Sequence, residues 1–111
     1  MTITEIYEKL GSLLDEKKYE KVEKICVDLE QLGHNDPILY LTSLLAEAGV
    51  NSVGELKNST LLLETCKSYT KVINAPLEED IVAYVVSCNE KTKESLLGVG
   101  FKERYKINKG K

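Results

Sequence analysis

The chain has 111 residues, of which 42% are hydrophobic and 30% are charged, and its formal net charge is −3. This composition is that of a single globular domain, and it excludes a disordered or collagen-like chain. No apolar run approaches the ~20 residues of a membrane helix. The first residues also lack the basic and apolar stretches of a signal peptide, so a cytoplasmic location is expected.

The charges divide the chain into two unequal parts. Residues 1–97 hold ten Lys against seventeen Asp and Glu, whereas residues 98–111 hold five Lys and Arg against one Glu. We therefore predict one acidic helical domain over residues 1–97, followed by a basic, flexible tail over residues 98–111.

Two amphipathic helices are predicted at the start of the chain. Thr2 and Glu5 have the spacing of a capping box, in which each side chain satisfies a free backbone donor of the other. Apolar residues then recur at helical period: Ile3, Ile6, Tyr7, Leu10, Leu13 and Leu14. A second helix is predicted from Tyr19 to Leu32, with an apolar stripe of Val22, Ile25, Cys26, Leu29 and Leu32. Gly33 suits the left-handed turn that often ends a helix.

A third helix is predicted from Pro37 to Ala48. Asp36 is a favourable N-cap, and a proline is well tolerated at the first helical position. The segment is apolar on nearly all sides, which predicts a central position covered by the other helices. Gly49 is the predicted stop.

The second half of the chain predicts two further helices. Ser52 and Glu55 have capping-box spacing, but Gly54 and Asn58 favour a short turn over residues 52–58, before a helix over residues 61–73. A fifth helix is predicted to begin at Pro76 and to end at Gly98 and Gly100. Its β-branched residues 81–86 would also suit a strand, but the acidic residues 78–80 are typical of a helix start, so we predict helix. The expected fold is therefore all-α, with about five antiparallel helices.

The first hairpin resembles the tetratricopeptide repeat, over about residues 4–37. Tyr7, Leu10 and Gly11 match the family's aromatic and Leu-Gly positions, and Tyr19 matches its turn aromatic after a one-residue deletion. Val22 and Leu29 stand where the family has small residues, and another helical array or bundle explains the same pattern. The resemblance implies stacked helical hairpins that bind peptides. Glu8 and Ser12 replace the Lys and Asn with which some members hold carboxylate tails, so no binding residue is transferred.

Reactive groups are sparse, and neither an enzyme nor a cofactor is predicted. Cys26, Cys66 and Cys88 are widely spaced and lie among apolar residues, which indicates buried thiols rather than a disulfide framework or a metal site. The single histidine, His34, lies in a predicted turn without an aligned nucleophile.

The sequence favours a non-enzymatic interaction module, an adaptor or assembly factor that binds a peptide or partner helix. Candidate contacts are Tyr7, Tyr40, Tyr69 and Tyr84, because tyrosines favour interfaces, although the same rings also suit the core. Two alternatives remain open: a small acidic inhibitor that blocks a basic partner, and a regulator that contacts nucleic acid through the basic tail. The candidate contacts in the tail are Phe101, Lys102, Arg104, Tyr105 and Lys106.

Overall fold

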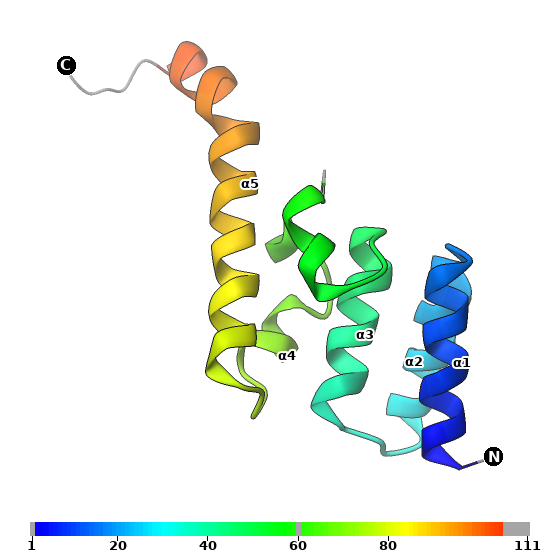
Figure 1. Ribbon diagram of the computed structural model, residues 1–111. Coiled ribbons are helices and arrows are strands. Elements are labelled where there is room, and N and C mark those ends of the chain that lie inside the picture. Colours follow the sequence, from blue (N-terminus) through cyan, green and yellow to red (C-terminus); the bar gives the residue numbers. More distant parts are fainter. Residues whose placement is uncertain (1, 60, 106–111) are drawn as a thin grey trace.

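A computed structural model describes residues 2–59 and 61–105, with side chains described as far as Glu94. Within these residues the protein is all-α, as predicted (Figure 1). Its elements are α1 (Ile3–Asp15), α2 (Tyr19–Gln31), α3 (Pro37–Ala48), the 3-10 helices η1 (Val53–Asn58) and η2 (Leu63–Thr65), α4 (Tyr69–Ile73) and α5 (Glu79–Tyr105).

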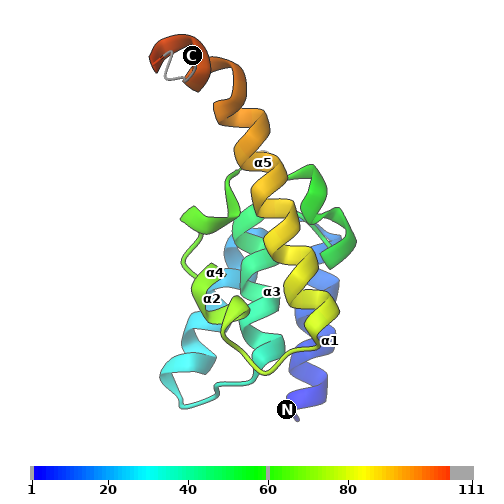
Figure 2. The ribbon, with the colours of Figure 1, turned by 90° about the vertical axis from the view of Figure 1, so that its left-hand side faces the viewer.

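The α-helices run alternately up and down and form two layers. α1, α3 and α5 follow one another in one layer, and α2 and α4 lie on one side of them (Figures 1 and 2). Each α-helix contacts the next in the chain, and α5 also packs on both 3-10 helices. Because the helices alternate in direction, α1, α3 and α5 all begin at the same end of the molecule.

The predicted start of α1 is confirmed by its hydrogen bonds. The Thr2 hydroxyl accepts a hydrogen bond from the Glu5 amide at 3.2 Å, and the Glu5 carboxylate accepts one from the Thr2 amide at 2.7 Å. The turn into α2 passes through Lys17, which has a left-handed φ of 62°. That conformation directs the chain back, so that the second helix packs antiparallel to the first.

The prediction for α3 is confirmed at both ends and in its position. Asp36 caps the helix by accepting a hydrogen bond from the Ile38 amide at 2.9 Å, and Gly49 ends it with a left-handed φ of 71°. Leu39 and Leu44 are fully buried, because α2 and α4 both pack on this helix. The apolar side chains on nearly all sides of α3 therefore form the centre of the hydrophobic core.

The continuous helix predicted over residues 61–73 is wrong. The chain there forms η2 and only five residues of α4. Local side-chain bonds compete with the helical ladder: the Ser59 hydroxyl donates to Leu61 O at 2.8 Å and accepts from Leu61 N at 3.1 Å. The Ser52 capping box is also wrong, since Ser52 makes no cap bond and Glu55 accepts from the Asn51 amide at 2.9 Å instead.

The limits of α5 differ from the prediction, although its helical character over residues 81–86 is confirmed. The helix begins at Glu79 rather than at Pro76, and it continues through Gly98 and Gly100 to Tyr105. A glycine costs a helix only about 1 kcal/mol, so two glycines did not end it. The last part of α5 extends beyond the other helices (Figures 1 and 2). Residues 106–111 of the predicted tail lie outside the described residues.

Candidate functional site

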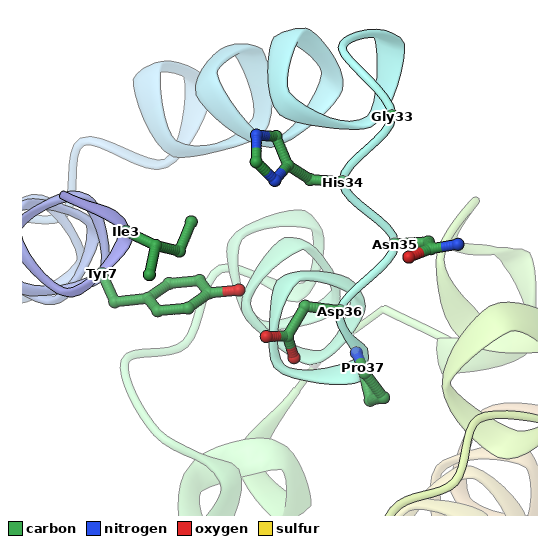
Figure 3. Close-up of a pocket in the computed structure, with 7 residues that line it drawn as sticks. All are labelled: Ile3, Tyr7, Gly33, His34, Asn35, Asp36 and Pro37. Atoms are coloured by element: carbon green, nitrogen blue, oxygen red, sulfur yellow. The ribbon is translucent and has the colours of Figure 1, made fainter. Parts of the chain in front are cut away.

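A pocket of about 440 Å³ lies where the first turns of α1 meet the loop between α2 and α3 (Figure 3). We call it the terminal pocket, and its lining residues are Ile3, Tyr7, Gly33, His34, Asn35, Asp36 and Pro37. The α1 capping box and the Asp36 cap of α3 hold its two walls in place. The pocket is therefore formed by the start of α1 and by the loop that leads into the start of α3.

Tyr7 and Asp36 form the polar side of the terminal pocket. The Tyr7 hydroxyl points toward the Asp36 carboxylate (Figure 3). Burial, followed by hydrogen bonding to Asp36 and the negative charge of Asp36, raises the pKa of Tyr7 to about 12. Tyr7 thus stays protonated as a donor, and Asp36 supplies the negative charge.

His34 points toward the same space from the α2–α3 loop, whereas the Asn35 amide points away from Tyr7 (Figure 3). His34 is exposed, and the pocket lining contains no Ser, Thr, Cys or Lys that it could activate. The arrangement offers a carboxylate, two ring faces and an apolar wall at Ile3. It suits recognition of a cationic or hydrogen-bonding group more than covalent chemistry.

Exposed aliphatic side chains occur at one residue of the pocket lining and at two residues next to the lining in the sequence. Leu32 is 77% exposed, Ile38 46% and Ile3 42%, and all three belong to the segments that line the pocket or adjoin it. The helical period placed Ile3 and Leu32 on the inward stripes of their helices, but both lie at helix ends, where no neighbouring element covers them. We call Ile3, Leu32 and Ile38 the apolar rim.

The pocket belongs to an acidic end of the molecule, which carries Glu5, Asp36, Glu78, Glu79 and Asp80 where α1, α3 and α5 begin. Residues 2–8, 31–40 and 74–82, which form this end, contain no Lys or Arg. Within the described residues, the ion pairs join Lys18 to Glu16, Lys24 to Asp28, Lys71 to Glu30 and Lys93 to Glu64. None of these cations neutralises the acidic end.

The four tyrosines proposed as contacts lie in different parts of the fold. Tyr7 lines the terminal pocket, and Tyr69 is buried in the core. Tyr40 is half-buried, with Lys71 Nζ 5.5 Å from its ring centroid. Tyr84 is half-buried and donates to Gly54 O at 2.9 Å, which ties α5 to η1. The structure therefore brings only Tyr7 to the pocket.

The candidate contacts predicted near the C-terminus lie beyond the residues whose side chains the structure describes. Phe101, Lys102, Arg104 and Tyr105 belong to the last turns of α5, but their side chains lie outside the described part, and so does all of Lys106. Their role as contacts stays a prediction. The residues that sequence reasoning missed are Asp36, which it assigned only to capping, and Leu32 and Ile38 of the apolar rim.

The three cysteines are free thiols buried in the core. Burial raises the pKa of Cys26 to about 12 and that of Cys66 to about 11, with further contributions from nearby carboxylates, including that of Glu47. Because the attacking species is the thiolate, Cys26 and Cys66 are unreactive at neutral pH. Among the described residues, no group of three or more His, Cys, Asp or Glu side chains is placed to hold a metal ion.

We expect the free energy of unfolding to fall as the pH rises from 8 to 10. The unfolded thiols lose protons above their ordinary pKa of 9.0, whereas the raised pKa values keep the folded thiols protonated. The loss approaches about 1.4 kcal/mol per pH unit for each thiol. Urea unfolding under reducing conditions measures it, and the Cys26→Ala and Cys66→Ala variants should show a shallower dependence. If the pH dependence in both variants were as steep as in the wild type, the assignment to these two thiols would be contradicted.

The chain matches no protein-family model, no curated protein and no solved structure. In the described part of the chain, no helix is both long enough and apolar enough to cross a membrane.

Proposed function

We propose that this protein is a non-enzymatic interaction module that binds a peptide or partner helix at the terminal pocket. The observation that carries the proposal is an open pocket whose Asp36 carboxylate forms no ion pair with a Lys or Arg of the described residues, together with the apolar rim of Ile3, Leu32 and Ile38. The tetratricopeptide resemblance stays a proposal like the adaptor role, because repeat and non-repeat proteins share an all-α fold.

The chemistry of the pocket selects a basic, amphipathic partner. A Lys or Arg side chain would donate a charge-assisted hydrogen bond to the Asp36 carboxylate and lie against the Tyr7 ring. Apolar side chains on either side of this cation would cover the rim. Fully burying a Leu or Ile side chain stabilises a complex by about 1.5–3 kcal/mol, so Leu32, the most exposed of the three, should contribute most.

The test uses synthetic amphipathic helical peptides that carry one Lys or Arg between Leu side chains, with Glu in place of the cation as the reference set. Fluorescence anisotropy would measure binding to the wild type, Asp36→Asn and Leu32→Ser. Asparagine caps a helix as well as aspartate does, so Asp36→Asn removes the charge and preserves α3. We expect each variant to bind basic peptides about tenfold more weakly or worse.

The matched control is Leu61→Ser, because Leu61 is 44% exposed and lies away from the pocket lining. This variant should bind as the wild type does. The proposal is wrong if no basic peptide binds at millimolar concentration, or if Asp36→Asn and Leu32→Ser bind as tightly as the control. The acidic-inhibitor and nucleic-acid alternatives stay predictions, since no observation on the described residues favours either of them.

A further inference from the structure

The acidic end and the basic segment of the chain, which we define as residues 101–111, are at opposite ends of α5. The helix begins at Glu79, at the acidic end, and it continues for 27 residues. A helix of this length spans about 40 Å. The five basic residues that follow Gly100 are Lys102, Arg104, Lys106, Lys109 and Lys111. Each copy of the protein therefore carries an acidic pocket at one end and the start of a basic segment at the other (Figure 1).

The basic segment cannot reach the terminal pocket of its own chain. Residues 106–111 span at most about 20 Å when fully extended, which is half the length of the helix that precedes them. Any contact between this segment and the pocket must therefore join two separate molecules.

We propose that the basic segment, residues 101–111, of one copy docks on the terminal pocket of a second copy. The proposal rests on the function proposed above and names a partner for the same site. In the segment, Phe101 precedes Lys102, and Arg104-Tyr105-Lys106-Ile107 alternates basic with aromatic or aliphatic residues. This is the combination of cation and apolar neighbours that Asp36 and the apolar rim accept.

The charges support a second copy over an unrelated occupant. The body is acidic and the segment basic, so the basic segment of one copy attracts the acidic end of another. The contact is heterologous, with different patches on the two partners, and such contacts form rings or open chains. Because it depends on exposed charges, salt should weaken it.

The test is sedimentation equilibrium of the full chain from 10 µM to 1 mM, at 25 mM and 500 mM NaCl. We expect the average mass of the wild type to rise with concentration in low salt, and to fall back toward the monomer in high salt. The pocket variant Asp36→Asn and the segment variant Lys102→Gln/Arg104→Gln/Lys106→Gln should each dissociate at least tenfold more readily. Leu61→Ser should associate as the wild type does.

A mixture of the two defective variants gives the decisive result. The pocket variant retains its basic segment and the segment variant retains its pocket, so an equimolar mixture should form dimers that cannot grow further. Neither variant alone should do so. A wild type that stays monomeric at 1 mM in low salt, or a mixture that shows no more association than its components, overturns the proposal.

The peptide titration separates this failure from a failure of the proposed function. If the wild type does not self-associate but binds the synthetic basic peptides, the self-docking proposal fails and the interaction site stands, with a partner other than a second copy. If it binds neither, both proposals fail. Self-association that survives in both defective variants also rejects the proposal, because it would use another surface.

Discussion

Replacing Asn89 by alanine should lower the free energy of unfolding by about 2–4 kcal/mol. Asn89 is only 2% exposed on α5. Its carbonyl accepts a hydrogen bond from the Glu64 amide at 2.9 Å, and its amide donates to the Glu64 carboxylate at 2.9 Å. A neutral hydrogen bond contributes about 0.5–1.5 kcal/mol and one to a charged group about 1.5–3 kcal/mol. Urea unfolding followed by circular dichroism measures the loss.

The control for this prediction is Lys93→Ala, since Lys93 also contacts Glu64, at 3.5 Å, but through an exposed ion pair. Such pairs contribute at most about 1 kcal/mol. A loss in Asn89→Ala no larger than that in Lys93→Ala would show that the paired amide does not hold α5. The result bears on function, because this contact fixes the first half of α5 and hence the direction in which the basic segment extends.

Replacing Glu47 by alanine should lower the free energy of unfolding by about 3 kcal/mol or more. Glu47 lies on α3 and accepts hydrogen bonds from the Ser68 amide at 3.0 Å, the Ser68 hydroxyl at 3.0 Å and the Ser43 hydroxyl at 3.2 Å. Ser43 and Ser68 are both buried, so removing the carboxylate leaves buried donors without acceptors, at about 1–3 kcal/mol for each unsatisfied group. The change is measured as unfolding free energy.

Glu47→Gln is the matched variant, because it keeps the volume of the side chain and one acceptor oxygen. We expect it to lose about half as much stability as Glu47→Ala. Equal stability of the alanine variant and the wild type would contradict the role assigned to Glu47. The role matters most for α4, which has five residues and makes no side-chain cap of its own. A helix of that length is not stable alone. Glu47 on α3 therefore stabilises the start of α4 by accepting the hydrogen bonds of Ser68.

The elements that the sequence predicted correctly are those whose signals are local. The Thr2–Glu5 box, the Asp36-Pro37 start and the Gly49 stop act within one helical turn, and all three appear in the structure. The helix over residues 61–73 failed for the opposite reason. The apolar residues Leu63 and Cys66 are buried, as their spacing predicted, but they do not belong to a continuous helix. Burial of a side chain does not require a helical backbone.

The candidate site was predictable only in part. Tyr7 was named as a contact for its residue type, and it does line the pocket. Nothing in the sequence indicated that Asp36 would face Tyr7, because Tyr7 belongs to α1 and Asp36 precedes α3, and only the packing of the helices brings them together. The position of Leu32 indicated its exposure only weakly. It directly precedes Gly33 at the end of α2, where few neighbouring residues are available to cover an apolar side chain.

The first three helices, the caps of α1 and α3 and the separation of acidic from basic charge follow from the sequence alone, because each depends on neighbours within a few residues. The terminal pocket, the apolar rim and the contacts of Glu47 and Asn89 depend on which elements pack together. Only the tertiary structure determines this packing. The hydrogen-bond partners of Glu47 and Asn89 lie 21 and 25 residues away in the chain.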